Sequence, residues 1–368
     1  MVTERLATLR SCLKKKNIAA VAINAGPTLT YLTGLHFHLM ERPVVLVVPA
    51  SGRPIIILPE LEQGKLEGVS FQLEIFTYGE DPATWGTIFI DALKDLVPEN
   101  DKIGVEPRHL RLLEYNLLLP ACRQAEIVDG SEIFAQLRSI KDEAEIACMR
   151  RAVVIAEESL EATLATLKIG VSEEEIASEL FLQLLRHGSE TALPFFPIVA
   201  SGPNGANPHS QPSVRKLAEG DLLIIDWGAR YNGYASDLTR TFAVGQIGEE
   251  EAAVYQAVQL ANDAGRGAGR PGVACREVDR AARECIDSAG YGQFFTHRTG
   301  HGIGMECHED PYMHGENRQL LEKGMTYTVE PGIYLPGRNG VRIEDDVLVT
   351  ENGSESLSTM SRELRSIG

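Results

Sequence analysis

The sequence is poor in cysteine, and its cysteines form no recognisable framework. Six are present in 368 residues, none at Cys-x-x-Cys spacing from another: Cys12, Cys122, Cys148, Cys275, Cys285 and Cys307. Dispersed cysteines of this kind argue against a disulfide-stabilised secreted domain and against a structural zinc module. We therefore expect reduced thiols and a cytoplasmic protein.

Long apolar runs and an excess of positive charge are also missing. No stretch approaches the roughly 20 apolar residues that a transmembrane helix requires, and the N-terminal residues lack the apolar core of a signal peptide. Aspartate and glutamate number 52 against 35 lysines and arginines, for a formal net charge of −17. We therefore expect neither nucleic acid nor a membrane surface as a partner.

The first part of the chain alternates helical patterns with short apolar runs, which is typical of a small α/β domain. Helices are expected at residues 6–16, 82–96 and 110–119, and strands at 18–23, 44–48, 54–58 and 102–105. We place this domain at residues 1–132. Longer helical patterns follow at 142–166, 172–187 and 249–265, together with runs that predict hairpins. We place a second domain, of the α+β class, at residues 133–368.

The first of these hairpins carries two aspartates. Asn232-Gly233 is a strong hairpin turn signal between apolar runs. A turn there places Gly228 opposite Asp237, so Asp226 becomes a diagonal neighbour of Asp237 on the same face of the sheet. Two carboxylates on one face beside a buried run repel each other unless a cation lies between them.

A second hairpin, over residues 327–349, repeats the arrangement with two glutamates. Pairing Leu335 with Val341 across the loop sets Gly332 opposite Glu344. Glu330 and Glu344 then become diagonal neighbours on one face, although a slip of one residue would separate them. This register is a hypothesis, because the loop length does not determine it.

A glycine-rich stretch between the hairpins contributes His301. Taken alone, each aspartate is more simply explained as a turn or cap residue. Taken together, four carboxylates and one imidazole are too many for one closed tetrahedral zinc site and suit two divalent ions about 3.5–4 Å apart. Oxygen-rich ligands favour Mn²⁺ or Co²⁺, with Fe²⁺ and Zn²⁺ as alternatives.

The motifs around these residues resemble those of the pita-bread metallopeptidases, a family that includes prolidase, aminopeptidase P, methionine aminopeptidase and the metal-free creatinase. The resemblance is strong from about Leu137 onward and weaker before it. It is carried by five motifs in order: Ile225-Asp-Trp-Gly228, Ser236-Asp-Leu-Thr-Arg240, Thr299-Gly-His-Gly-Ile-Gly304, Val329-Glu-Pro-Gly332 and Val341-Arg-Ile-Glu-Asp345. It implies a pita-bread catalytic domain preceded by a creatinase-type N-terminal domain.

The resemblance also implies which metal ion each ligand binds. Asp226 and Asp237 would bind one metal, His301 and Glu330 the other, and Asp237 with Glu344 would bridge them. A bridging hydroxide would then attack the substrate carbonyl, as in other two-metal hydrolases.

The same resemblance marks residues on the substrate side. His209 is expected to stabilise the oxyanion and His308 to contact the substrate near the scissile bond. Glu330 is also the candidate proton shuttle. Arg342 is expected to hold Glu344 or a substrate carboxylate, and a purely structural pairing with neighbouring acids is as strongly indicated. Further cleft-lining candidates are His297, Tyr312 and Tyr334.

The implied reaction is hydrolysis of the imide bond before proline. Tyr31-Leu-Thr-Gly34 resembles the N-terminal domain of prolidases and aminopeptidases P, which methionine aminopeptidases lack. We favour Xaa-Pro dipeptides as substrates, with aminopeptidase P activity on longer peptides as the alternative. A creatinase-like amidinohydrolase and an inactive binding module on the same fold are further alternatives.

The resemblance implies a homodimer, in which the N-terminal domain of one subunit lies near the active site of the other. We hypothesise that His38 or Arg42, in a polar loop at residues 34–43, reaches the neighbouring cleft and limits substrate length. A solvated loop with ordinary salt bridges is the alternative.

Overall fold

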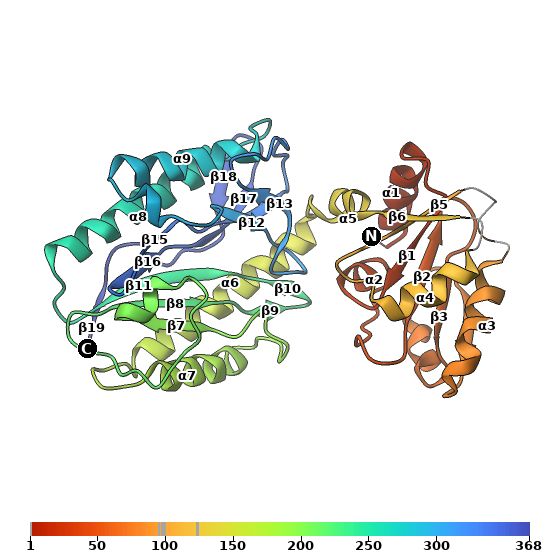
Figure 1. The fold of residues 1–368 in the computed structure, drawn as a ribbon, viewed down its shortest axis with the longest axis horizontal. Helices are drawn as coiled ribbons and strands as arrows, with labels where there is room; N and C mark the ends of the chain where they lie inside the picture. Colours follow the sequence, from red (N-terminus) through yellow and green to blue (C-terminus); the bar gives the residue numbers. More distant parts are fainter. Residues whose placement is uncertain (1, 95, 97–100, 123–124) are drawn as a thin grey trace. The chain divides into compact units, whose positions relative to one another are not determined.

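A computed structural model of the chain describes residues 2–94, 96, 101–122 and 125–368. The chain divides into two compact units, Met1–Arg138 and Ser139–Gly368, whose elements are labelled in Figure 1. The division follows helix α5 (Ser131–Arg138), whereas the sequence suggested residue 132. Within the described residues, no helix combines the length and the apolarity needed to cross a membrane.

The first unit contains a six-stranded sheet in the order β4-β3-β2-β1-β5-β6. Its helices are α1 (Val2–Lys15), α2 (Pro27–Thr33), α3 (Pro82–Leu93), α4 (Leu112–Ala121) and α5, with a 3₁₀ segment at Glu60–Gly68. Its strands are β1 (Ala20–Asn24), β2 (Val45–Pro49), β3 (Ile55–Pro59), β4 (Glu74–Tyr78), β5 (Lys102–Val105) and β6 (Glu126–Asp129).

The central strands of this sheet are buried on both faces, as continuous apolar runs predict. Every residue of β1, β2 and β3 is buried, and α3 adds Trp85 and Phe89 to the core. The expected α/β domain is therefore confirmed. Residue 95, within the helix expected at 82–96, lies outside the described residues.

The second unit has two larger sheets, ordered β19-β11-β8-β7 and β13-β12-β14-β17-β18. Its helices are α6 (Glu143–Leu164), α7 (Glu173–Arg186), α8 (Glu249–Ala268) and α9 (Cys275–Ser288), with 3₁₀ segments at Gly202–Ala206 and Gly292–Phe294. Its strands are β7 (Ile198–Ser201), β8 (Leu222–Trp227), β9 (Arg230–Tyr231), β10 (Tyr234–Ala235), β11 (Leu238–Val244), β12 (Gly300–Gly302), β13 (Glu309–Met313), β14 (Thr326–Val329), β15 (Gly332–Leu335), β16 (Asn339–Arg342), β17 (Asp345–Val349), β18 (Ser354–Ser356) and β19 (Ser366–Ile367).

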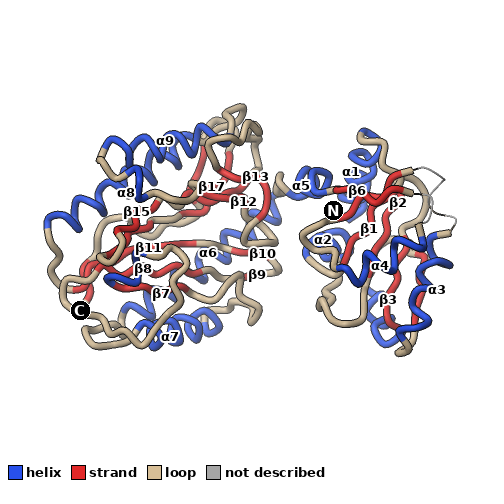
Figure 2. The backbone as a smooth tube through the Cα atoms, viewed as in Figure 1, coloured by secondary structure: helices blue, strands red, loops and turns tan. Residues whose placement is uncertain are grey.

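The strands of this unit lie between two pairs of helices. Figure 1 shows α8 and α9 on one side and α6 and α7 on the other, and Figure 2 shows the same layers as blue helices around red strands. The arrangement is the expected pita-bread architecture. The acidic residues lie at or beside strand ends: Asp226 in β8, Asp237 before β11, Glu330 after β14 and Glu344 before β17.

Helices α6 and α7 begin directly after Asp142 and Ser172, the residues at which the sequence predicts their helical patterns to start. The side chains of Asp142 and Ser172 each accept a hydrogen bond from the backbone amide three residues later. The side chains of Glu145 and Glu175 in turn accept from the backbone amides of Asp142 and Ser172, which completes two capping boxes. Helix α9 was not anticipated. Its apolar residues at helical spacing, Val278, Ala282 and Ile286, are all buried, so the signal was present in the sequence.

Candidate active site

The first acidic hairpin folds in the expected register. Tyr231 pairs with Tyr234, and Asp226 pairs with Thr239, which places Asp237 one diagonal step from Asp226. The turn residues Asn232 and Gly233 have φ values of 48° and 81°, as a type I′ turn requires. Both aspartates are buried, with 8% and 4% of their surface exposed.

The register expected for the second hairpin is wrong. Leu335 pairs with Asn339, and Gly332 with Arg342, because the loop is a tighter turn in which Gly337 has a φ of 72°. The correction is a shift of two residues, which preserves the face that each side chain occupies. Glu330 and Glu344 therefore still share a face, and the register of β14 with β17 continues to place them opposite each other.

The glutamate-bearing strands are held by α8 and by the first hairpin. The side-chain amide of Asn262 donates to the carbonyls of Val329 (3.0 Å) and Ile343 (3.2 Å), each of which precedes one of the glutamates. The hydroxyl of Thr239 donates to Glu344 Oε2 at 2.6 Å. The backbone amide of Glu344 also donates to the carbonyl of Thr239 at 3.0 Å. These bonds join the two hairpins at their acidic ends.

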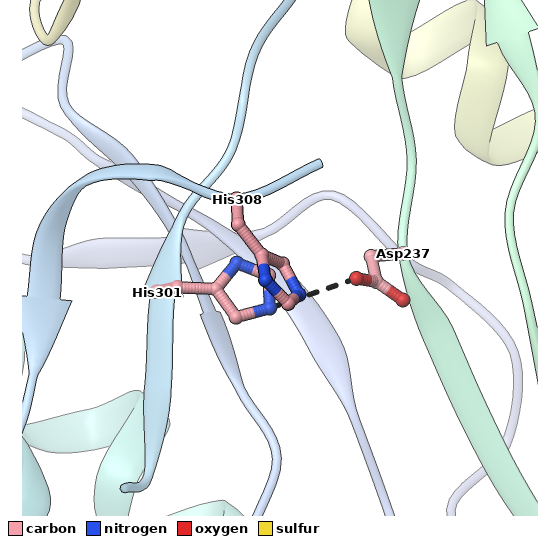
Figure 3. Close-up of side chains that lie close together, drawn as sticks. All are labelled: Asp237, His301 and His308. Carbon is pink, nitrogen blue, oxygen red and sulfur yellow. Dashed lines mark ion pairs between the residues drawn. The ribbon is translucent and has the colours of Figure 1, made fainter. Parts of the chain in front are cut away.

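His301 faces this acidic centre from β12. Its Nδ1 hydrogen-bonds the carbonyl of Gly302 at 3.1 Å, which leaves Nε2 directed at Glu330 Oε1 (3.4 Å) and Asp237 Oδ2 (3.7 Å). Figure 3 shows the approach of His301 to Asp237, with the ring of His308 beside that of His301. The two ring centroids lie 3.9 Å apart.

All five expected ligands converge in three overlapping groups whose potential ligand atoms lie within 4.8 Å of one another. The groups are Asp226 with Asp237 and Glu344, His301 with Glu330 and Glu344, and Asp237 with His301 and His308. His308, which the sequence assigned to the substrate, thus lies close enough to belong to the cluster.

Arg342 lies against an aspartate. Its guanidinium donates to Asp226 Oδ2 at 2.6 Å and to the hydroxyls of Tyr334 (3.0 Å) and Thr239 (3.1 Å). The residue is 3% exposed, and no direct hydrogen bond to Glu344 is found among the described residues. These bonds fix the position of the Asp226 carboxylate relative to Tyr334 and Thr239.

His209 lies on the exposed loop between β7 and β8. Burial is the main influence on the pKa values of Asp226, His297 and His308, and a charge on the His209 ring would be a smaller influence on all three. Arg342 Nη1 also approaches the carbonyl of the preceding Pro208 at 3.4 Å.

Comparison with known proteins agrees with this geometry. The model of metallopeptidase family M24 matches residues 147–351, and that of the creatinase/prolidase N-terminal domain matches residues 5–140. The chain belongs to metallopeptidase family M24. Its first unit corresponds to the N-terminal domain that precedes the M24 domain in creatinases and prolidases.

Solved structures of M24 relatives cover the whole chain. Prolidase from Thermococcus sibiricus has a TM-score of 0.94 and 34% identity, covering 100% of this chain and 99% of its own. Dipeptidase PepE from Mycobacterium ulcerans has a TM-score of 0.91 and 35% sequence identity, and the match covers 100% of this chain and 98% of the PepE chain. Xaa-Pro dipeptidase from Bacillus anthracis gives 0.89 and 32%, with 100% of both chains covered.

The electrostatics of this M24 site indicate a place for cations. Burial raises the pKa of Asp237 and Glu344 well above their usual range, and the repulsion of neighbouring carboxylates raises both further. Burial likewise raises the pKa of Glu330 to about 8. Asp226 Oδ1 is buried without a hydrogen-bond partner. Carboxylate oxygens that repel one another, one of them without a hydrogen-bond partner, fit divalent metal ions.

The imidazoles around the M24 centre are held neutral. Burial lowers the pKa of His301 well below its usual value, and the neighbouring His308 lowers it further. Burial also lowers the pKa of His308, and that of His297 to about 4. A neutral imidazole can ligate a cation or donate a hydrogen bond to substrate.

The cleft-lining candidates differ in their surroundings. His297 Nε2 hydrogen-bonds the hydroxyl of Tyr334 at 2.8 Å, which links this pair to Arg342. Tyr312 instead lies under the guanidinium of Arg298, whose carbon is 4.4 Å from the ring centroid.

The sequence analysis does not single out several residues that support the site. Thr239 lies two residues after Asp237 on the same face, so the correct hairpin register could have indicated it. Cys307 also contacts the site, and its thiol donates to Asp237 Oδ2 at 3.0 Å. Asn262 and Asp346, which accepts from the amide of Asp237 at 3.1 Å, carry no local signal. Their contacts arise only when distant elements pack.

Proposed function

We propose that this M24 chain hydrolyses the imide bond of Xaa-Pro dipeptides with the help of two divalent cations. The observation that carries the proposal is the set of three overlapping ligand groups, which contains every carboxylate and the imidazole singled out in the sequence. Similarity to proteins titled prolidase and Xaa-Pro dipeptidase supports the choice of substrate.

Two positions for cations follow from the ligand set. Asp226 and Asp237 would hold one, His301 and Glu330 the other, and Asp237 with Glu344 would be shared. Bound there, the cations supply an acidified water molecule and a Lewis acid for the substrate carbonyl. We propose Mn²⁺ or Co²⁺, with Fe²⁺ and Zn²⁺ as alternatives, because carboxylates outnumber imidazoles.

Glu330 is proposed to carry the proton. Its raised pKa of about 8 shows how strongly the site favours the protonated carboxyl in the absence of added positive charge. A carboxylate in such surroundings can take a proton from water and deliver it to the leaving proline nitrogen. That nitrogen belongs to a tertiary amide and needs a proton to depart as an amine.

His209 and His308 are proposed to act on the carbonyl side. Each is a potential donor toward the oxygen that becomes negative as the carbonyl is attacked. The ring of His308 lies beside that of His301, and His209 follows Pro208, whose carbonyl accepts a hydrogen bond from Arg342. Arg342 is proposed to act through Asp226, which leaves its role toward the substrate indirect.

Substrate length and assembly complete the proposal. We propose a cytoplasmic homodimer in which His38 or Arg42 restricts the neighbouring cleft to dipeptides. His38 is exposed, whereas Arg42 pairs with Glu80 at 2.7 Å and Glu41 at 3.1 Å. If Arg42→Ala leaves the ratio of dipeptide to tripeptide cleavage unchanged, Arg42 has no part in selecting length.

The deciding experiment uses enzyme stripped of metal by a chelator and reconstituted with Mn²⁺ or Co²⁺. Hydrolysis of a Met-Pro dipeptide and of a Met-Pro-Xaa tripeptide is then measured in parallel. Metal-restored cleavage of the dipeptide alone is expected, and preference for the tripeptide would identify aminopeptidase P activity. Failure to cleave either, with metal bound, would favour an amidinohydrolase or a binding module.

A further inference from the structure

A buried glutamate lies outside the metal centre, at the start of α7. Glu173 is the first residue of the helix and is fully buried, although glutamate is rarely buried without partners. Its carboxylate accepts hydrogen bonds from five donor groups on Ser201, Asn204 and Ser213. All three lie at the ends of one loop, residues 202–213, which we call the His209 loop.

The two carboxylate oxygens hold opposite ends of this loop. Oε1 accepts from the amide and the hydroxyl of Ser201, both at 2.7 Å. Oε2 accepts from the amide of Ser213 at 3.1 Å and from its hydroxyl at 2.7 Å. The amide group of Asn204 spans both oxygens, at 3.1 and 2.9 Å. One side chain thus closes the loop at its base.

Backbone bonds at the same helix end reinforce the closure. The amides of Glu173 and Glu174 donate to the carbonyls of Arg215 (3.0 Å) and Ser213 (3.1 Å). Beyond a short 3₁₀ turn, the His209 loop contains no regular secondary structure. Near its tip, the amide of His209 donates to Asn207 Oδ1 at 3.1 Å, a bond within the loop itself.

We propose that Glu173 is a positioning residue that sets the His209 loop, and so the ring of His209, relative to the metal centre. The inference rests on the role of His209 in the proposed function. A carboxylate suits this place because it only accepts hydrogen bonds, and every facing group donates. An amide of the same shape would direct its own hydrogens at one of the serines.

The substitution Glu173→Gln tests this directly in the full-length, metal-reconstituted protein. Hydrogen–deuterium exchange of the amides in residues 202–213 is expected to accelerate at least about tenfold, because one end of the loop loses its acceptor. Glu175→Gln is the matched control. Glu175 lies in the same helical turn but is exposed, and among the described residues its side chain bonds only the cap residue Ser172, so the loop should exchange at the wild-type rate.

A double-mutant cycle then separates positioning from general stability. Glu173→Gln is expected to lower kcat for Met-Pro roughly tenfold, with metal content and KM little changed, since one oxyanion donor is commonly worth 10²–10³ in kcat. In a His209→Ala background the same substitution should have almost no further effect on kcat. An equal loss in both backgrounds would overturn the proposal.

Two provisions keep the outcomes distinct. If Glu173→Gln does not fold, Asn204→Ala removes the amide that spans the two oxygens and also donates to the Ser213 hydroxyl, and the same exchange and kinetic readouts apply with smaller effects. If the wild-type protein binds metal but cleaves no Xaa-Pro peptide, the proposed function fails, and loop exchange alone decides the anchoring. Unchanged exchange in both variants would contradict the anchoring itself.

Discussion

At the scale of single residues, Glu330 lies among carboxylates whose mutual repulsion a bound cation would reduce. Its side chain is 17% exposed and lies 3.4 Å from His301, beside three other acidic ligands. Its pKa of about 8 exceeds the value of ~4.3 expected in the unfolded chain. The contribution of Glu330 to the free energy of unfolding is therefore greatest below pH ~4.3, where the carboxyl is protonated in both states. This contribution is lost as the pH rises through about 8.

We therefore predict that the metal-free protein loses stability between about pH 4 and about pH 8.5, a range that spans both pKa values. The thermal midpoint in chelator should fall over this range, and it should fall less with Mn²⁺ bound, because the cation favours the ionised carboxylates. Glu330→Gln removes one such group and should make the fall in chelator smaller, whereas Asp237 and Glu344, whose pKa values are also raised, remain. A midpoint that rises with pH in the wild-type protein alone would contradict this account.

Thr239 provides a second prediction at this scale. Its hydroxyl is fully buried, donates to Glu344 and accepts from Arg342. Thr239→Val should cost about 1–3 kcal/mol in denaturant unfolding, because two buried polar groups lose a partner. It should also weaken metal binding roughly 10–100-fold, as the loss of a group that orients a ligand does elsewhere.

The matched control is Thr241→Val, two residues along β11. Thr241 is equally buried, but its hydroxyl bonds only the backbone of Arg342. This variant should lose stability while keeping wild-type metal affinity in a calorimetric titration. Equal metal affinities for both variants would mean that Thr239 does not orient Glu344.

At the scale of elements, the two chains of the first hairpin approach each other closely at Gly228 and Ser236. A Cβ added to Gly228 would lie 2.0 Å from the carbonyl oxygen of Ser236, where backbone cannot move aside cheaply. Gly228→Ala should therefore destabilise the protein by more than about 3 kcal/mol and lower metal occupancy, because this part of the hairpin lies between Asp226 and Asp237.

Gly267→Ala is the control for this substitution. Gly267 lies in α8, and an added Cβ would meet nothing within 4 Å. Alanine is a better helix former than glycine, so this variant should be stabilised by about 0.5–1 kcal/mol. Denaturant unfolding and metal analysis of the two variants would show whether the cost at Gly228 belongs to the hairpin.

At the scale of the whole molecule, all the ligands belong to the second unit. Metal binding should therefore stabilise that unit and leave the first unchanged. Scanning calorimetry of the intact protein is expected to resolve a component that shifts downward by several degrees in chelator and another that does not. Equal shifts of the entire transition would show that the two units unfold as one.

Much of this architecture was accessible from local patterns. Apolar runs predicted the buried strands of the first unit, and Ser172 marked the start of α7 because capping is decided within one helical turn. The hairpin at Asn232-Gly233 was predicted in its correct register, since a turn that requires two positive φ values leaves little choice. The turn at Gly337 is less specific, and its register was misplaced by two residues.

By itself, then, the sequence determined the residue types of the proposed ligands, their order and the face of the sheet that each shares with its neighbour. Successive side chains of a strand point to alternate faces of the sheet, so a shift of two residues in the pairing leaves each side chain on the same face. Only the tertiary structure decided that Arg342 would pair with Asp226, that Asn262 would hold both glutamate strands, and that Glu173 would close the His209 loop. These contacts join segments far apart in the chain, and no local pattern encodes them because they exist only once the helices and sheets have packed.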